Sequence, residues 1–475
     1  MKLPLKGRLL SLKSVLALAF VIRVSVFAAA LWCAKDYAVF YAKDTGTYLQ
    51  PATELLATGN FATNGVAEIM RTPGYPLLLA VGLKLGHVEL VTIFLQIILS
   101  CLTCHLVYSL TKQVFEHERT ALYAALLFSL EPLSILYSCL LLSDTLFVFL
   151  IAASLNSLIR AYQQNRFGHW LLAALALVGA VYTRPVGYFL PPGLVLVLMT
   201  WAIVKKERKL LLNTAVFCLL TMGLIGLWQV RNTLATGYTG FSTTSEIVLY
   251  FYHSGAVKAQ QQGVPFYEVV EQLGYYDSEL YFRHHPEQQT WTAGLRYAYL
   301  RGEGFKTLLQ TPKLYAQIYG RGILVMLLDP GVIEYLKLFR QYRKSDRVLN
   351  VIAKQGVLAA IQHLISENPG LIFFGGLLGL FLLGFYLLSL AGLSSATLRT
   401  SLPLVLLLCT CFYFIAVSGG IVAVSRFRAP MMPLLSVFAG QGLIVLSAWR
   451  RVRNSGLSNI GLALNADTQW NENNR

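Results

Sequence analysis

Ten apolar segments dominate the sequence, and they are close to the roughly 17–25 residues that a helix needs to cross a bilayer. They are Val15–Leu31, Val88–Leu110, Ala121–Tyr137, Asp144–Ile159, Trp170–Tyr182, Val186–Val204, Leu210–Trp228, Leu371–Leu390, Leu402–Val417 and Met431–Leu446. Hydrophobic residues make up 56% of the chain and charged residues only 13%, whereas soluble globular proteins carry about 25% charged residues. The sequence therefore predicts an all-α polytopic membrane protein with about ten transmembrane helices.

The positive charges predict how the chain is oriented. The formal net charge is +16, and much of it falls in short basic runs beside apolar segments, as the positive-inside rule describes. With the N-terminus inside, all of these runs fall on the cytoplasmic side, as does the C-terminus. The opposite loops hold no N-x-S/T acceptor, which favours a bacterial inner membrane with a periplasmic loop face. The charge does not indicate nucleic acid.

This orientation divides the chain into six parts. We expect a cytoplasmic N-terminus with a retained first helix, a first external loop, six further helices, a large and mainly helical external segment, three helices and a disordered cytoplasmic tail. Their ranges are 1–33, 34–87, 88–228, 229–368, 369–449 and 450–475.

The first external loop is polar and punctuated by glycine. It carries Asp44 and Arg71, and Asp44 precedes a predicted helix over Thr45–Thr58 that Gly59 ends. The apolar stretch Pro73–Gly86 is too short to span, so we expect an interfacial or re-entrant helix there.

Other ionisable residues lie at or beside the ends of apolar segments. Charges at such depth are costly and usually paired, so Asp144 and Arg184 are expected either to pair with each other or to contact the loop or a substrate. Arg231 follows the seventh span, and Arg426 and Arg428 lie at the outer end of the last one. Three histidines of the external segment are candidates to act on an acceptor or are solvated loop residues: His253, His284 and His285.

No metal site or disulfide framework is expected. All seven cysteines lie within or at the ends of apolar segments, where a free cysteine behaves as a small buried hydrophobe. We therefore expect no cofactor.

A set of short motifs resembles a known family. Asp44 is followed by Tyr48, Ala52, Leu55, Gly59 and then R-T-P-G-Y-P-L at Arg71–Leu77. Further matches follow in order at Glu131–Ser138, Leu141–Phe147, Thr183–Tyr188, Trp228–Asn232 and Ser425–Pro433. Together they resemble the polytopic GT-C glycosyltransferases, especially the protein mannosyltransferase and lipid A aminoarabinose transferase branch of the family 39 type.

The resemblance implies an inverting hexosyl- or pentosyltransferase. Such an enzyme moves a sugar from a polyprenyl-phosphate carrier to a cell-envelope lipid, glycan or protein on the external face. Asp44 would be the catalytic base, and Tyr48, Tyr75, Asp144 and Arg184 would support the site. The donor phosphate would be held by Arg71, Arg231, Arg426 and Arg428.

Plainer interpretations exist for the same residues. Asp44 can serve as a helix N-cap, and an interfacial arginine can contact lipid headgroups. Thr45 stands where the family often has a second acidic residue, which argues against a paired-carboxylate mechanism. The W-W-D type motif of the oligosaccharyltransferase branch is absent, so a divalent metal is not favoured.

Two other functions fit parts of the sequence. A lipid-linked saccharide ligase or polymerase also has many spans and a large external loop, but it would use a diphosphate-linked donor. A transporter or flippase would place broken helices and polar groups near the membrane midplane, whereas the polar residues here gather at one face.

Overall fold

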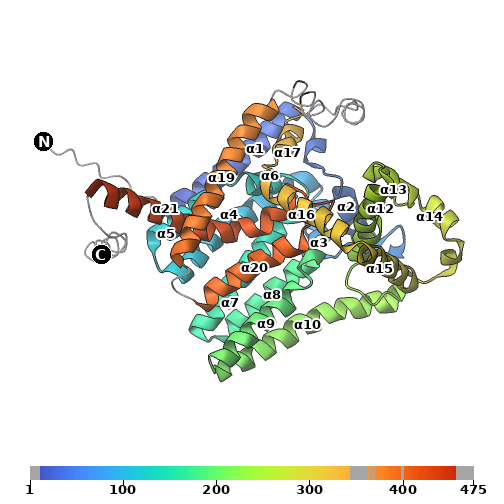
Figure 1. Ribbon diagram of the computed structural model, residues 1–475, viewed down its shortest axis with the longest axis horizontal. Coiled ribbons are helices and arrows are strands. Elements are labelled where there is room, and N and C mark those ends of the chain that lie inside the picture. The colour runs from blue at the N-terminus through green and yellow to red at the C-terminus, as the bar shows by residue number, and fades with distance from the viewer. Residues whose placement is uncertain (1–10, 343–361, 363–365, 367–369, 397–400, 456–475) are drawn as a thin grey trace.

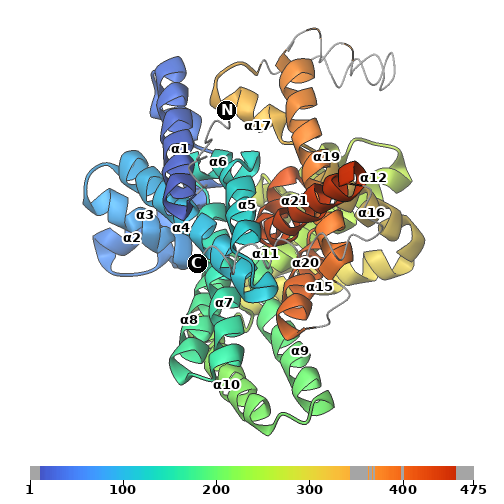
Figure 2. The same cartoon turned by 90° about the vertical axis from the view of Figure 1, so that its left-hand side faces the viewer.

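The computed structural model describes residues 11–342, 362, 366, 370–396 and 401–455. It is a helical bundle with smaller helices along one edge (Figure 1). The bundle helices are α1 (Leu12–Ala34), α4 (Val88–Phe115), α5 (Glu118–Ser129), α6 (Pro132–Cys139), α7 (Asp144–Gln164), α8 (Phe167–Thr183), α9 (Leu190–Val204), α10 (Arg208–Thr236), α19 (Gly370–Ala396), α20 (Leu402–Val417) and α21 (Met432–Ser455). In the second view, α8, α9 and α10 project together to one end, opposite α1 and α19 (Figure 2).

Seven helical segments of the described chain are long and apolar enough to cross a membrane. The predicted span Ala121–Tyr137 is instead α5 and α6, bent by 52°, so it counts as an eighth only if both are taken together. The bend arises at Glu131, because its carboxylate accepts the N–H groups of Leu133 and Ser134 and starts a new helix.

Two more predicted spans are short helices. The segments Trp170–Tyr182 and Leu402–Val417 form α8 and α20, of 17 and 16 residues. The predicted fold class is confirmed, while the count of ten stays a prediction: it comprises seven long helices, one bent pair and two short helices.

The first external loop folds into five small elements. Its 3₁₀ helix η1 (Tyr37–Phe40) leads to α2 (Thr45–Thr58), which has the predicted bounds and ends at Gly59 with a left-handed φ of 77°. A two-stranded hairpin pairs β1 (Ala62–Thr63) with β2 (Val66–Ala67). The last element is α3 (Gly74–Lys84), the short apolar helix expected there.

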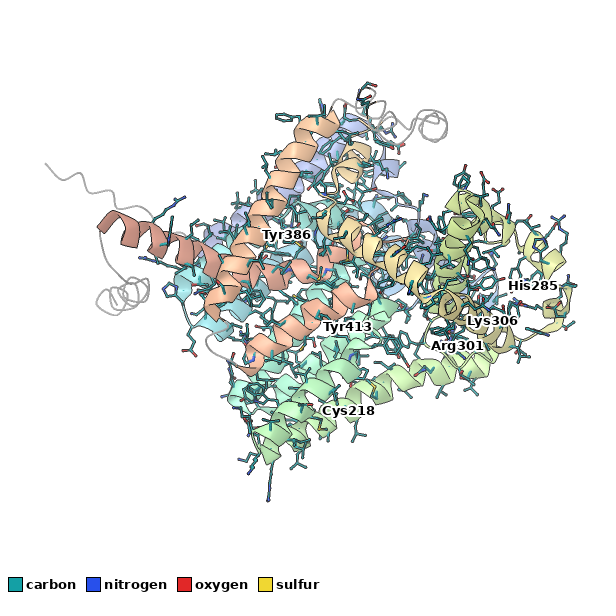
Figure 3. All side chains as sticks on the ribbon, viewed as in Figure 1. Cys218, His285, Arg301, Lys306, Tyr386 and Tyr413 are labelled. Atoms are coloured by element: carbon teal, nitrogen blue, oxygen red, sulfur yellow. The ribbon has the colours of Figure 1, made fainter. Side chains whose placement is uncertain are left out.

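The external segment is helical, and α12 to α15 gather at the edge where α10 ends (Figure 1). Its elements are α11 (Thr244–Ile247), the π-helix η3 (Val248–Ser254), α12 (Gly255–Gln262), α13 (Phe266–Gln272), α14 (Ser278–His284), η4 (Pro286–Thr290), α15 (Ala293–Gln310), α16 (Pro312–Leu328) and α17 (Val332–Leu338). His285, Arg301 and Lys306 mark its outer part, away from Tyr386 and Tyr413 of the bundle (Figure 3).

Several bundle helices run further than predicted. Helix α10 continues past Trp228 to Thr236, and α21 continues to Ser455, into the expected tail. The remainder of that tail, 456–475, lies outside the described residues.

Arg23 is fully buried in the bundle core. The Nε of Arg23 donates to Ser100 Oγ at 2.7 Å, and its other nitrogens donate to two backbone carbonyls and to Ser134 Oγ. A buried cation is tolerated when its donors are satisfied. Arg23 thus ties α1 to α4 and to the α5–α6 bend.

Candidate functional site

Asp44 lies at the start of α2, but its side chain does not cap the helix. The residue has helical dihedral angles (φ −81°, ψ −19°), and its carboxylate accepts no N–H from the first turn. Instead, Oδ1 lies 3.3 Å from Arg71 Nη2, and Oδ2 accepts a 2.8 Å hydrogen bond from Arg426 Nη1. The N-cap interpretation is therefore wrong, and the carboxylate faces two guanidinium groups.

Asp144, at the start of α7, is the second carboxylate of the site. It is 1% exposed, its Oδ2 accepts a 2.7 Å hydrogen bond from Arg426 Nε, and its Oδ1 pairs with Arg184. Of the two alternatives for Asp144 and Arg184, the structure has the direct pair.

These five side chains form one continuous charge network. Charges alternate along it, and Arg426 is the central member because it binds both carboxylates. Three guanidinium groups and two carboxylates leave an excess of one positive charge. In chain order the network is Asp44, Arg71, Asp144, Arg184 and Arg426.

Backbone contacts hold the first loop against the bundle at this point. The N–H of Leu141 donates to the carbonyl of Phe40 at 2.8 Å, and the hydroxyl of Thr45 donates to the carbonyl of Leu141 at 2.8 Å. Thr45, at the position where a second acidic residue was considered, is fully buried. Its role is to fix the start of α2 beside α7.

A close approach of α3 to α8 brings Arg71 and Arg184 to the same place. A Cβ on Gly74 would lie 2.7 Å from Thr183 Oγ1 and 2.8 Å from Thr183 N, so only glycine permits this packing. Arg71 lies three residues before Gly74, and Arg184 directly follows Thr183. The close packing of α3 against α8 thus explains the glycine of the P-G-Y-P motif.

The charge network keeps Asp44 ionised. Partial burial on its own favours the neutral acid, but the guanidinium groups of Arg426 and Arg71 outweigh that effect and lower the pKa of Asp44 below its ordinary value. The Asp44 side chain is 39% exposed, against 15% for Arg426 and 16% for Arg71. Asp44 is therefore the carboxylate of the network that a substrate can reach.

Arg71 is held by its neighbours on α2 and by a turn. Its Nε donates to Thr47 Oγ1 at 2.9 Å, and its guanidinium carbon lies 4.4 Å from the centre of the Tyr48 ring, a cation–π distance. The buried carboxylate of Glu68 accepts the backbone N–H groups of Met70 and Arg71. The guanidinium thus has a fixed direction.

Tyr48 and Tyr75 form a buried pair next to the network. Their rings meet edge to face at 5.1 Å, and the Tyr48 hydroxyl lies 3.2 Å from Ser143 Oγ. The Tyr75 hydroxyl donates to Gln96 Oε1 at 2.9 Å. Tyr48 contacts Arg71 directly, and Tyr75 packs against Tyr48; their supporting role in the site stays a prediction.

Two of the predicted arginines lie outside the network. Arg231 donates to the carbonyls of Glu68 and Phe61, each at 2.6 Å. Arg428 is 1% exposed and donates through Nη1 to three carbonyls at the end of α16. Their predicted part in phosphate binding stays a prediction. The three carbonyls are those of Met326, Leu327 and Asp329.

The histidine candidates separate into two settings. The ring of His253 packs against those of Tyr315 and Tyr319, and burial lowers its pKa to about 4. His284 and His285 lie at the end of α14, and desolvation also lowers the pKa of His285. None of the three contacts the charge network.

Sequence reasoning missed two neighbours of the site. Thr47 orients Arg71, and its place in the first turn of the predicted helix was the available signal. Tyr252 lies on the π-helix η3, where burial, Tyr275, Tyr276 and the Asp44 carboxylate raise its pKa. Nothing in the tyrosine-rich sequence distinguishes Tyr252, although π-helical turns often mark functional sites.

The described residues contain no group of three or more His, Cys, Asp or Glu side chains that could hold a metal ion. Both carboxylates of the network are already paired with guanidinium groups.

Comparisons with known proteins agree with this architecture. Residues 70–228 match the family model of dolichyl-phosphate-mannose-protein mannosyltransferases. No curated protein sequence matches the chain.

A solved structure shows a similar fold. It is the oligosaccharyltransferase AglB of Archaeoglobus fulgidus in complex with an inhibitory peptide and a dolichol-phosphate, with a TM-score of 0.51, 15% identity and 96% of this chain covered. The chain covers 54% of that protein and so spans about half its length. ArnT of Cupriavidus metallidurans bound to undecaprenyl phosphate gives a TM-score of 0.37 at 15% identity, covering 92% of this chain and 79% of its own.

Proposed function

We propose that this chain, which has the fold and carries sequence features of the GT-C membrane glycosyltransferases, moves a sugar from a polyprenyl-phosphate carrier to a cell-envelope acceptor. The resemblance predicted from the motifs is confirmed by the family model and the archaeal fold. The proposed reaction proceeds with inversion, on the periplasmic face of a bacterial inner membrane.

The observation that carries the proposal is the reachable carboxylate of Asp44 between two guanidinium groups. The acceptor oxygen would attack the anomeric carbon while its proton passes to Asp44. The bond between the anomeric carbon and the phosphate oxygen would break, and the polyprenyl phosphate would leave with the electron pair. Proton removal by a positioned base typically contributes about 10²–10⁴-fold in rate.

The arginines of the network would receive the phosphate. Arg71 and Arg426 flank Asp44 and are partly exposed, and guanidinium groups bind phosphate oxygens in a bidentate way. The excess positive charge of the network would be neutralised by the donor phosphate. As these guanidinium groups turn toward the phosphate, Asp44 would lose part of their stabilisation and become a stronger base.

The test is transfer by purified Asp44→Asn with an undecaprenyl-phosphate-linked sugar as donor, followed by mass spectrometry. We expect the transfer rate to fall by about 10²–10⁴-fold. The unfolding temperature of the variant should equal that of the wild type. Glu54→Gln is the matched control, because Glu54 lies on the same helix and only accepts the N–H of Gly65. Wild-type transfer by Asp44→Asn would refute the assignment of the base.

The same assay separates the rival functions. A diphosphate-linked donor should be inactive here and active with a ligase or polymerase. Movement of the carrier lipid across a vesicle bilayer without sugar transfer would indicate a transporter.

A further inference from the structure

A cavity of about 430 Å³ lies apart from the charge network, between the external segment and the last part of the bundle. Three pieces of chain form its walls: the α12–α13 region, the middle of α16, and part of the loop before η5 (Ser425–Met431). Its volume is within the range of ligand sites, about 300–1,000 Å³. Its lining residues are Ala256, Ala259, Gln260, Gly263, Val264, Phe266, Ile318, Arg321, Gly322, Val325, Gly420, Ile421 and Ala423.

The wall is apolar with one cation. Eight of the thirteen lining residues have an aliphatic or aromatic side chain, none is acidic, and Arg321 is the charged one. Within the described chain, Arg321 makes no ion pair. An apolar cavity with an available guanidinium suits an amphiphile that has an aliphatic chain and an anionic group.

The third wall of the cavity is the loop Ser418–Val424, which we call the strap. Its backbone is closely confined by its neighbours. Gly420 has a φ of 98°, and its N–H donates to the carbonyl of Tyr319 at 3.3 Å. A Cβ on Gly322 would lie 2.0 Å from the Gly420 oxygen, and a Cβ on Gly420 would lie 2.3 Å from His253. The strap is thus fixed between α16 and the π-helix η3.

The strap joins the cavity to the charge network. Ala423 lines the cavity, and Arg426, three residues later, binds Asp44 and Asp144. On the other side, Phe266 lines the cavity, and the centre of its ring lies 6.0 Å from that of Tyr252. The Asp44 carboxylate is one of the groups that raise the pKa of Tyr252. The cavity and the charge network are therefore connected through the strap and through Phe266 and Tyr252.

We propose that this cavity binds the aliphatic chain of the acceptor and that Arg321 binds its anionic group, so that the acceptor is an anionic lipid. This inference rests on the proposed function, in which the donor phosphate occupies Arg71 and Arg426. The cavity has its own cation, on α16, and is therefore assigned to the second amphiphile of the reaction.

A binding measurement tests the site without relying on transfer. The probe is a phosphatidic acid that carries a diazirine in its acyl chain, cross-linked to the detergent-solubilised full chain and mapped by peptide mass spectrometry. We expect labels on α12, α16 and the strap. Val264→Trp, which fills the cavity, should remove most of the label, while Leu324→Trp on an exposed position of α16 should retain it.

A charge variant tests the cation in the same way. Arg321→Gln should weaken probe binding about tenfold, as expected for the loss of a charged hydrogen bond, whereas Lys313→Gln, also exposed on α16, should leave it unchanged. The Michaelis constant for an anionic lipid acceptor should rise in Val264→Trp and Arg321→Gln, with that of the donor unaltered.

The outcomes separate this inference from the proposed function. Undecaprenyl phosphate could displace the label, or Val264→Trp could raise the Michaelis constant for the donor. Either result would show that the donor chain occupies the cavity, and it would overturn this inference but not the proposed function. Wild-type lipid transfer by both cavity variants would also overturn it. Full transfer by Asp44→Asn would instead remove the proposed function, while labelling of the cavity would still report on binding.

Discussion

Two arginines at the outer end of the last helix occupy regions of different character. Arg426 lies in the charge network, between two carboxylates. Arg428, two residues later, lies in a carbonyl site formed by the end of α16. A guanidinium with a partly exposed side-chain partner is able to exchange that partner for a phosphate, whereas one held by backbone carbonyls stabilises the fold.

The two regions stabilise their arginine by different electrostatic effects. The last carbonyls of a helix lack partners within it and carry partial negative charge, so a buried cation is favoured at that end. In the charge network, formal charges compensate one another next to a reachable carboxylate. The comparison predicts that substitutions will separate activity from stability.

The largest effect should follow Arg426→Gln. This change removes the group that binds both carboxylates, and loss of one preorganised charged donor typically costs about 10²–10³-fold in turnover. The added loss of alignment at Asp44 places our expectation at the upper end, about 10³-fold. The measurement is the turnover number with saturating donor. An enzyme with more than a tenth of wild-type turnover would contradict the assignment of Arg426 to the network's function.

The next effect is on stability, from Arg428→Met. The carbonyls of α16 would lose a charged donor in a buried place, which costs about 3 kcal/mol. Denaturant unfolding in detergent should show this loss, while turnover at low temperature stays within a few-fold of wild type. If Arg428→Met folds normally and loses turnover, the carbonyl site belongs with the active site and the comparison fails.

A smaller loss of stability is expected for Gly74→Ala. The new methyl group would overlap Thr183, and overpacking of this kind costs about 1–3 kcal/mol. Because α3 would shift away from α8, Arg71 and Arg184 should separate and transfer should fall as well. Gly193→Ala on α9 is the control, since a Cβ there meets nothing within 4 Å. Equal stability of the two variants would show that the close approach is not required.

The smallest effect concerns pH. The lowered pKa of Asp44 means that the stability and activity it contributes are present above the ordinary carboxyl pKa and are lost as pH falls through the lowered value. Arg71→Gln removes one of the stabilising cations, so the acid limb of the kcat/KM profile should move to higher pH by about one unit. An unmoved acid limb would show that the limb does not report Asp44.

Much of the fold follows from local sequence. Apolar length predicted the long helices, and the bounds of α2 follow from Gly59, which takes the left-handed conformation that ends it. The bend between α5 and α6 was missed because hydropathy averages over Glu131 and Pro132, although their order is a typical helix start.

The candidate site was predicted in part. All five residues were proposed from the sequence: Asp144 and Arg184 because charges next to apolar segments require partners, and Asp44, Arg71 and Arg426 from the resemblance to the GT-C family. Their convergence was not predictable from spacing, because the five residues lie on four separate parts of the chain. Tyr252 escaped notice for the same reason: its position near Asp44 depends on how the external segment folds back.

The sequence by itself determined that this is a helical membrane protein and which charged residues needed partners, because the cost of placing charge among apolar residues depends on local composition. Only the tertiary structure decided that Arg426, and not its neighbour Arg428, meets Asp44. Both arginines lie in one turn of η5, where side chains two residues apart point in different directions, and the packing of α16 and the first loop determines which direction faces each partner.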